Sequence, residues 1–357
     1  MSDYVKLSNI VVEDPSFVDA VDQVLPEESQ LIRSGIVQDG ALGEDVPETT
    51  KTVTCPSWAE IADSTPGAAD DEVISTEDKD LTPRGFSMVG DIATTLVRGK
   101  AFQMSDLAKI YAGAKGDPAL FLARAVARYQ SRQEQYALVA ALNGVFGHNA
   151  AKGQTDIGAA GDLIYDITGR AGDAKYLGRN TIAWAKQKLG SSRGNLVAIA
   201  CHSIFATELS TIDKAMWEPA SESTGFVPRY CGLAVIEDDS LPYDPSTKTA
   251  TAFLFGSGAF ARQRLSIENP MEFTRKALAS QSIVIRRWRM LLHPRGIKWI
   301  GTAAKETPSN AELATAGNWK QVYQTKQIRM VKMIANLRAT EDSGALRVQI
   351  VSGDVET

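Results

Sequence analysis

Asp117 to Gly147 reads DPALFLARAVARYQSRQEQYALVAALNGVFG and predicts the longest helix of the chain. Asp117 can accept a bond from a first-turn amide, and Pro118 stands where a missing N–H costs nothing. Apolar residues recur at steps of three and four, the period of one buried face: Leu122, Ala125, Val126, Tyr129, Tyr136, Val139, Ala140 and Leu142. Gly144 and Gly147 are the predicted exits. The helix would span about 40 Å, so we expect it to be the spine of the fold.

Five consecutive polar residues interrupt the apolar pattern at the middle of this helix. They are Ser131, Arg132, Gln133, Glu134 and Gln135. A helix buried all round would not carry such a run, so this midsection predicts solvent exposure or a contact between subunits. The interruption also disfavours a coiled coil, which needs apolar positions sustained over several heptads. An ordinary core helix of a large domain remains the alternative.

Composition indicates a soluble protein with a substantial core. The 357 residues allow two domains, and they are 44% apolar and 23% charged. No apolar run is long enough to cross a bilayer, and the N-terminus lacks the basic start and apolar run of a secretion signal, so we expect a cytoplasmic origin. Cys55, Cys201 and Cys231 are odd in number and show no C-x-x-C spacing, which favours free thiols over disulfides or a zinc site.

The net charge of −5 conceals two oppositely charged parts of the chain. Residues 1–80 carry 19 acidic and 4 basic side chains, whereas residues 260–340 carry 4 acidic and 15 basic ones. Complementary potentials steer association, so acidic segments of one copy are expected on basic surfaces of another. The alternative is an incidental polarity in a monomeric enzyme.

The N-terminal third predicts extended segments more than a core. Residues 1–50 are acidic and aperiodic, as in an arm. Strand-like stretches at 51–61 and 85–100 are joined by an acidic link at 62–81, which predicts a protruding two-stranded loop. Such a loop buries little apolar area alone and needs a partner surface. A short helix over 104–114 is expected to lead into the spine.

After the spine, helices and strands alternate, which is typical of a compact α/β or α+β unit. The predicted helices are 178–189, 203–214 and 310–317. The predicted strands are 195–201, 232–237, 249–255, 282–292, 297–300 and 327–334.

Candidate catalytic residues are few. The histidines are His148, His202 and His293, and the sequence places no convincing partner beside any of them. A nucleophilic pair of Cys201 and His202 is disfavoured, because adjacent residues on a strand point to opposite faces. The acidic run Glu237–Asp239 could hold a hard cation, but a solvated turn is the better interpretation.

A glycine-rich turn is the remaining candidate for enzyme chemistry. Gly256, Gly258 and Ala261 match G-x-G-x-x-A after a strand, the weakest form of the dinucleotide fingerprint. The segment that follows does not supply the helix and distant acidic residue of a Rossmann unit. We therefore favour a close approach of strands, and we expect no catalytic residue, cofactor or metal site.

A basic string interleaved with tryptophans lies near the C-terminus: Arg286, Arg287, Trp288, Arg289, Arg295, Lys298 and Trp299. The pattern could indicate nucleic-acid binding, but a pI near 5.4 weighs against it. We favour salt links between subunits, with a solvated strand face and phosphate contact as alternatives. The predicted contact residues are Arg286, Arg287 and Arg289 on the basic side, and Asp70, Asp71 and Glu72 on the acidic side.

Taken together, seven stretches resemble the major capsid proteins of tailed bacteriophages with the Hong Kong 97 shell fold, over about residues 50–340. They are WAKQKL (184–189), NLVAIACHSIFATEL (195–209), GLAVIEDDSLP (232–242), TAFLFGSGAF (251–260), ENPMEFTRKAL (268–278), RRWRMLLHPRGIKWIG (286–301) and NAELATAGNWKQVY (310–323). The resemblance implies an α+β fold with five parts. These are an N-terminal arm (1–40), an extended two-stranded loop (41–103), a peripheral domain (104–175) with spine helix 117–147, an axial domain (176–250), and return strands with the C-terminus (251–357).

The resemblance also implies a function. The chain would be a structural subunit, not an enzyme, that assembles with itself into pentamers and hexamers of an icosahedral shell around double-stranded DNA. The shell would form in the bacterial host cytoplasm and become the virion capsid. Scaffolding, portal and decoration proteins would be partners, with weak non-specific contact to DNA and no membrane or cofactor. The alternatives are an encapsulin-like nanocompartment shell and, in another class, a soluble α/β enzyme using the Gly256–Gly258 turn.

Overall fold

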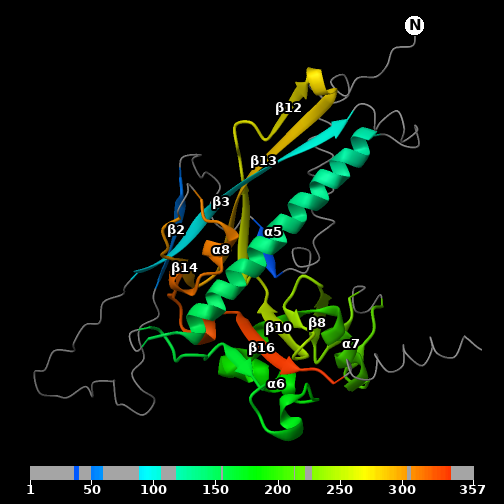
Figure 1. The fold of residues 1–357 in the computed structure, drawn as a ribbon. Helices are drawn as coiled ribbons and strands as arrows, with labels where there is room; N and C mark the ends of the chain where they lie inside the picture. The colour runs from blue at the N-terminus through cyan, green and yellow to red at the C-terminus, as the bar shows by residue number, and fades with distance from the viewer. Residues whose placement is uncertain are drawn as a thin grey trace, which may run out of the picture.

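One long helix joins two sheets in this protein (Figure 1). The computed structural model describes residues 36–39, 50–58, 88–105, 118–153, 156–212, 214–221, 227–303 and 307–338. Helix α5, Pro118–Ala150, lies along a six-stranded sheet and ends against an eight-stranded one (Figure 1). Within the described residues, no helix has the length and apolar content needed to cross a bilayer. Residues 1–35 of the predicted arm (1–40) and the acidic link (62–81) lie outside the described residues.

The spine helix is confirmed, but its predicted exits are wrong. Helix α5 continues through Gly144 and Gly147 to Ala150. A Cβ on Gly144 would lie 2.1 Å from the carbonyl oxygen of Leu313 and 2.4 Å from Nε1 of Trp319. Glycine is therefore required here because a neighbouring segment approaches closely, and not because the helix stops.

That neighbouring segment is a small unit packed on α5. It contains helix α8 (Asn310–Leu313), strand β15 (Trp319–Gln321) and strand β14 (Ile297–Trp299), which pairs with β15. Trp299 and Trp319 meet edge to face with ring centroids 5.1 Å apart. The indole N–H of Trp319 donates to the Leu313 carbonyl at 2.7 Å.

The six-stranded sheet has the order β1-β11-β13-β3-β2, and β12 also pairs with β13. Its strands are β1 (Val37–Asp39), β2 (Thr52–Trp58), β3 (Met88–Ser105), β11 (Phe260–Leu265), β12 (Met271–Lys276) and β13 (Gln281–Pro294). The predicted pairing of the two extended segments is confirmed, with Thr52 opposite Thr94 and Trp58 opposite Met88. Strand β2 passes through Pro56, which an edge strand tolerates.

Two local predictions for this sheet were wrong. Met104 and Ser105 continue strand β3, where we expected the start of a short helix, because both pair with the start of β13. The rest of that predicted helix, 106–114, lies outside the described residues. Strands β11 and β12 were not predicted at all.

The eight-stranded sheet has the order β4-β16-β10-β5-β8-β7-β6, and β9 pairs with β10. Its strands are β4 (Ile164–Asp166), β5 (Leu196–Cys201), β6 (Trp217–Glu218), β7 (Arg229–Tyr230), β8 (Leu233–Glu237), β9 (Tyr243–Asp244), β10 (Thr249–Gly256) and β16 (Met330–Asn336). Helix α6 (Thr181–Lys186), the 3-10 helix η2 (Gln187–Asn195) and helix α7 (Ser203–Ile212) pack around it. These elements confirm the predicted strands at 195–201, 232–237 and 249–255, whereas the strand predicted at 327–334 begins later, at Met330, and extends to Asn336. The proposed domain limits stay predictions.

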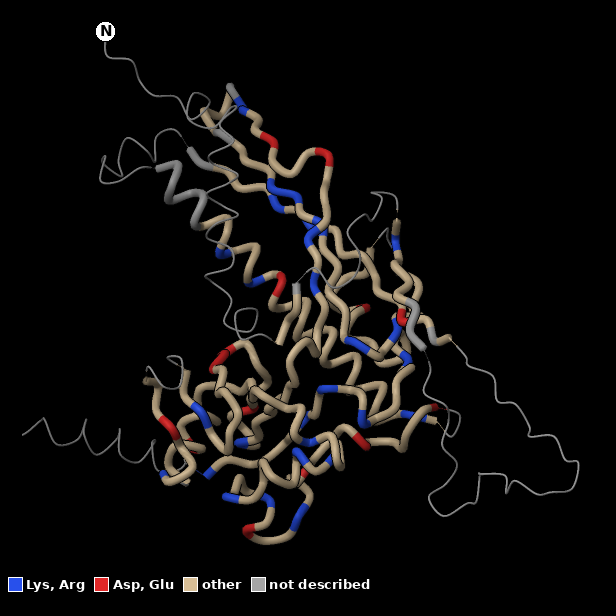
Figure 2. The backbone as a smooth tube through the Cα atoms, turned by 180° about the vertical axis from the view of Figure 1, so that it is seen from behind, with Lys and Arg blue, Asp and Glu red and all other residues tan. Residues whose placement is uncertain are grey.

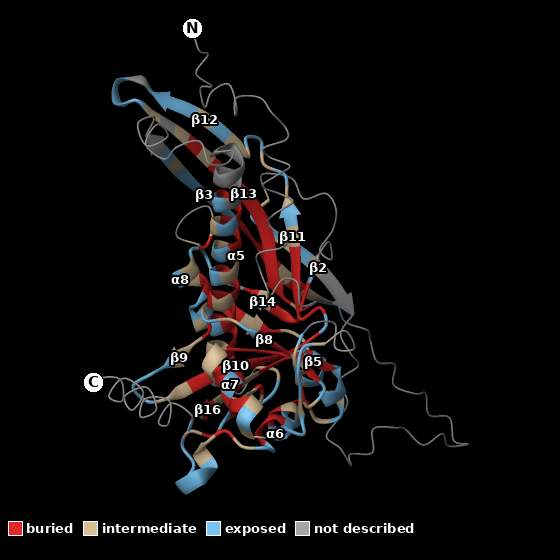
Figure 3. Ribbon diagram, turned by 90° about the vertical axis from the view of Figure 1, so that its right-hand side faces the viewer, coloured by how far each residue is buried: buried red, intermediate tan, exposed pale blue. Residues whose placement is uncertain are grey.

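A single core connects the spine to both sheets (Figure 3). Phe146 of α5 stacks on Phe253 of β10 with centroids 5.6 Å apart, and Phe255 and Phe260 continue the row. The glycine-rich turn lies within this row. Gly258 has φ +66°, and a Cβ on Gly256 would lie 2.6 Å from the Asn195 carbonyl oxygen, so the close approach of strands is confirmed.

Candidate functional site

Five arginines gather on strands β11 and β13 at the level of the middle of α5. We define the arginine layer as Arg262, Arg264, Arg286, Arg287 and Arg289. Figure 2 shows a run of Lys and Arg segments along the strands beside the helix. Arg262, Arg286 and Arg289 are only 4%, 5% and 4% exposed. A pocket of about 330 Å³ is lined by four members of the layer and by Gln130 and Glu134 of the helix.

The polar middle of α5 supplies acceptors for two arginines of this layer, Arg262 and Arg286. Arg262 Nη1 donates to Glu134 Oε2 at 3.2 Å, and Gln130 Nε2 donates to the other oxygen, Oε1, at 3.1 Å. Arg286 Nε in turn donates to Gln130 Oε1 at 3.2 Å. The chain of bonds runs from one strand through the helix to the next strand. Buried guanidinium groups need such acceptors, since an unpaired buried charge is costly.

Our prediction of an exposed midsection was therefore wrong for part of it. Ser131 and Glu134 are 2% and 3% exposed, and Glu134 bonds to Arg262 of its own subunit. Arg132 points to solvent, so the run of five polar residues covers two sides of the helix. The sequence could not distinguish these sides, because the buried charges come from strands that lie more than 120 residues later.

The structure brings the three predicted contact arginines onto one strand but in different surroundings. Arg286 belongs to the buried side, and Arg289 Nη2 donates to the Thr50 carbonyl at 3.0 Å. Arg287 is partly exposed and pairs with Glu272 at 2.9 Å on the opposite face. The acidic residues predicted to meet these arginines, Asp70, Asp71 and Glu72, lie outside the described residues. Salt links between copies thus stay a prediction.

A buried histidine and a buried aspartate join strand β3 to the end of strand β13. His293 Nε2 lies 2.7 Å from Asp91 Oδ1, and the Gly296 amide donates to Asp91 Oδ2 at 2.9 Å. Both side chains are buried. The expectation that no histidine has a partner is wrong here, because sheet pairing brings together residues 202 positions apart. The sequence did contain one indication of a buried polar pair, since Asp91 is a charged residue inside the strand-like stretch at 85–100.

The other candidate catalytic groups show no reactive arrangement. Burial raises the pKa of the Cys201 thiol, and the charge of Glu237 adds to the effect, so Cys201 is held away from the thiolate form. Burial lowers the pKa of His148, whose Nε2 accepts from the Gln321 amide at 3.4 Å. All three cysteines are free, as predicted. No cluster of three metal-ligating side chains occurs among the described residues.

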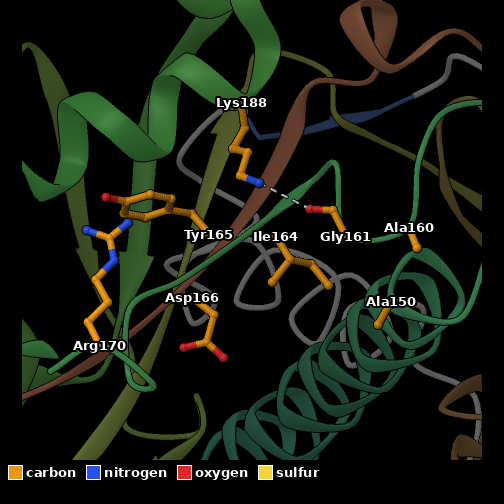
Figure 4. Close-up of a pocket in the computed structure, with 8 residues that line it drawn as sticks. All are labelled: Ala150, Ala160, Gly161, Ile164, Tyr165, Asp166, Arg170 and Lys188. Carbon is orange, nitrogen blue, oxygen red and sulfur yellow. Dashed lines mark hydrogen bonds between the residues drawn. The ribbon is translucent and has the colours of Figure 1, made fainter.

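A shallow pocket of about 450 Å³ lies where α5 meets strand β4 (Figure 4). Its lining residues are Ala150, Ala160, Gly161, Ile164, Tyr165, Asp166, Arg170 and Lys188. The Arg170 guanidinium lies over the Tyr165 ring, 5.2 Å from its centroid, and Lys188 Nζ donates to the Gly161 carbonyl at 3.3 Å. The lining contains neither histidine nor cysteine.

A polar network beside this pocket ties the end of α5 to the eight-stranded sheet. Asp162 accepts from Asn149 Nδ2 at 2.6 Å, from Lys152 Nζ at 2.9 Å and from the Thr325 hydroxyl. Burial by itself would raise the pKa of Asp162. The bonds from Thr325, Asn149 and Lys152 outweigh that effect and hold the pKa below its ordinary value.

Asp162→Asn should lower the thermal stability of the subunit and make that stability less dependent on pH in acid. A carboxylate with a lowered folded-state pKa contributes stability above its unfolded pKa of about 3.9, and that contribution is lost as the pH falls through the folded pKa. We expect Tm at pH 7 to fall by about 3–8 °C, with less further loss than in the wild type below about pH 4. Thermal melts between pH 3 and pH 7 measure both effects. Asp173→Asn, at an exposed pair with Arg338, is the control; equal effects from both variants would contradict the role of the network.

Solved structures with this architecture are capsid subunits of bacteriophages. The capsid of Ralstonia phage GP4 matches with a TM-score of 0.54 and 10% identity, covering 85% of this chain and 88% of that one. The Cyanophage Pam1 capsid matches with a TM-score of 0.52 and 11% identity over 87% and 92% of the two chains. The head structure of Helicobacter pylori bacteriophage KHP40 gives 0.52, 10% identity, and 87% and 91% coverage. The fold is therefore the Hong Kong 97-like capsid fold.

Sequence comparison identifies the family. No protein-family model matches the chain. The major capsid protein of Bacillus phage SPP1 is 32% identical over 352 residues, which covers 94% of this chain and 99% of the relative. The chain belongs to the phage major capsid proteins and is a structural subunit of a capsid shell. The alternative of a soluble enzyme is not favoured.

Proposed function

We propose that copies of this chain close into pentamers and hexamers, and that these form an icosahedral shell around double-stranded DNA in the cytoplasm of a bacterial host. The observation that carries the proposal is the match to the SPP1 major capsid protein along 94% of the chain. The subunit has no catalytic step of its own, consistent with the inert surroundings of Cys201 and His148. Its task is to present surfaces that fit other copies.

The proposal includes further partners of the shell. Scaffolding, portal and decoration proteins would contact the outside, the inside or one vertex of the assembly. Contact with packaged DNA would be weak and non-specific, because a chain of net charge −5 repels a polyanion overall.

Within this assembly, we place Asp70, Asp71 and Glu72 of one copy near Arg287 of its neighbour. Arg287 is the partly exposed member of the three predicted arginines, and its present partner Glu272 is itself exposed. An exposed pair exchanges partners at little cost, since it is worth about 0–1 kcal/mol. Arg286 and Arg289 lie beneath and would contribute through their charge.

Size-exclusion chromatography and negative-stain microscopy of the purified chain test the assembly. We expect capsomers or megadalton shells. A small, closed oligomer at all concentrations would contradict the proposal.

The same preparation tests the Arg287 contact by light scattering. Arg287→Glu should slow assembly of free subunits, and about 1 M salt should slow the wild type in the same way, because the Debye length falls to about 3 Å. Finished shells should resist that salt. Arg132→Glu, on the solvent side of α5, is the matched control. Assembly that responds neither to Arg287→Glu nor to salt would remove this contact from the proposal.

A further inference from the structure

The strand register gives the eight-stranded sheet two distinguishable ends. Strand β5 starts at Leu196, which lies opposite Gly256 at the end of the antiparallel strand β10. Strand β16 starts at the same end, since Met330 pairs with Phe255 of β10. The parallel strands β5 and β8 finish together at the other end, where Cys201 pairs with Glu237.

Four cations gather at the end where β5 and β16 begin. We define them as the basic corner: Lys188 and Arg193 of η2, Lys326 of the 3-10 helix η6 (Thr325–Gln327), and Arg329 just before β16. The two 3-10 helices are in contact, and the Lys326 side chain lies beside Gly190. All four side chains are exposed.

Among the described residues, the hydrogen bonds of the basic corner go to neutral groups. Lys188 donates to the Gly161 carbonyl, Arg193 to the Gln187 amide oxygen, and Arg329 to the Ser257 carbonyl at 2.8 Å. These acceptors are neutral. None of the four cations pairs with a carboxylate in the part of the chain that the structure describes.

Four carboxylates gather at the opposite end of the same sheet. We define them as the acidic corner: Glu237, Asp238, Asp239 and Asp244. Glu237 is the last residue of β8, Asp238 and Asp239 follow it, and Asp244 of β9 lies opposite Thr249 at the start of β10. Glu237, Asp239 and Asp244 are exposed.

The acidic corner is charged and likewise lacks a lysine or arginine partner among the described residues. Hydrogen bonds from Ser246 and Thr247 lower the pKa of Asp244 to about 2, and the Ser203 hydroxyl lowers that of Asp239. His202 lies 3.7 Å from Asp239.

We infer that the basic corner of one copy docks on the acidic corner of the next copy around a capsomer. The two corners stand at opposite ends of strands about 20 Å long, so one subunit cannot join its own corners. A contact between different patches of identical copies is heterologous and generates a ring when the rotation closes. This inference rests on the proposed shell function and names the surfaces that join neighbours.

A second copy explains both corners at once. Complementary potentials speed the encounter and fix the register of the partners, and like-charged alternatives repel. A DNA duplex would satisfy the basic corner alone and would leave the acidic corner without a role.

Charge reversal with cross-rescue tests the inference. One variant carries Lys188→Glu, Arg193→Glu and Lys326→Glu; the other carries Glu237→Lys and Asp244→Lys. Each variant alone should form rings at least about tenfold more slowly than the wild type, as measured by mass photometry. Mixing the two should restore rings with an even number of subunits only, because every contact then needs one copy of each kind. Joining both sets of changes in one chain should restore assembly without mixing.

Controls distinguish loss of this contact from misfolding, from a role in DNA binding and from failure of the proposed shell assembly. Thermal melts establish that each variant is folded. A destabilised variant is replaced by the corresponding Gln or Asn changes, which should slow ring formation by a smaller but measurable factor. Lys100→Glu with Lys276→Glu, exposed on the other sheet, should leave assembly unchanged.

The inference would be overturned if both corner variants assembled like the wild type. It would also be overturned if neither variant formed rings and no mixture of the two restored them. Normal shells that merely fail to hold duplex DNA would assign the basic corner to DNA instead. Absence of rings from the wild type would count against the proposed function.

Discussion

Gly144→Ala should lower the stability of the subunit by about 2–3 kcal/mol, although alanine is the better helix former by about 1 kcal/mol. The new methyl group would meet the Leu313 oxygen at 2.1 Å and Trp319 Nε1 at 2.4 Å, far inside van der Waals contact. Relief requires the unit that contains α8 and β15 to move away from α5, and this loses packing between that unit and the helix. Urea unfolding followed by tryptophan fluorescence measures the loss.

Gly147→Ala is the matched control for this prediction. Its Cβ would lie 3.2 Å from the Cβ of Ala316, so a shift of a few tenths of an ångström suffices. We expect a change of less than about 1 kcal/mol in either direction. If both alanine variants unfold at the same urea concentration as the wild type, the close approach at Gly144 does not exist in solution.

The second large effect is expected at Glu134. It is the one carboxylate among the residues lining the pocket under α5, and four arginines line the same pocket. Glu134→Leu removes an acceptor of Arg262 and one partner of Gln130, and it takes the only carboxylate out of that pocket lining. Removing one member of a buried ion pair costs about 3–5 kcal/mol, so we expect little soluble protein or a strongly lowered urea midpoint.

Two substitutions calibrate that result. Glu134→Gln keeps a hydrogen-bond acceptor but loses the charge, so it should fall between wild type and Glu134→Leu. Arg132→Gln on the solvent side of the same helix turn changes the net charge by one unit as well, and should alter stability by less than about 0.5 kcal/mol. Equal stability of all four proteins would mean that the arginine layer is neutralised by other groups.

Periodicity found the elements whose buried faces repeat. Helix α5 and strands β5 and β10 present apolar side chains at regular steps, and the sequence predicted each of them to within a few residues. Strands β11 and β12 were not predicted, because FARQRL and MEFTRK carry charged residues at positions where an amphipathic strand has apolar ones. In β11 the burial of Arg262 is made possible by Glu134, a residue on another element.

The candidate site was harder to predict for the same reason. The bond between His293 and Asp91, and the bond between Arg286 and Gln130, each join residues that are more than 150 positions apart. Gly144 looked like a helix stop, since no local pattern reveals that a tryptophan from residue 319 fills the space beside it. Long-range pairing of polar groups leaves no periodic trace in a single sequence.

The close contact at Gly144 also fixes the point about which α5 can tilt. The helix is held where α8 and β15 press on it, and Pro118 lies 26 residues away, or about 39 Å at about 1.5 Å per residue. A tilt of about 5° around Gly144 would displace the start of the helix by about 3 Å, which is the rise of about one strand residue. Small angular differences between copies near Gly144 therefore become whole-residue displacements at the far end of the helix.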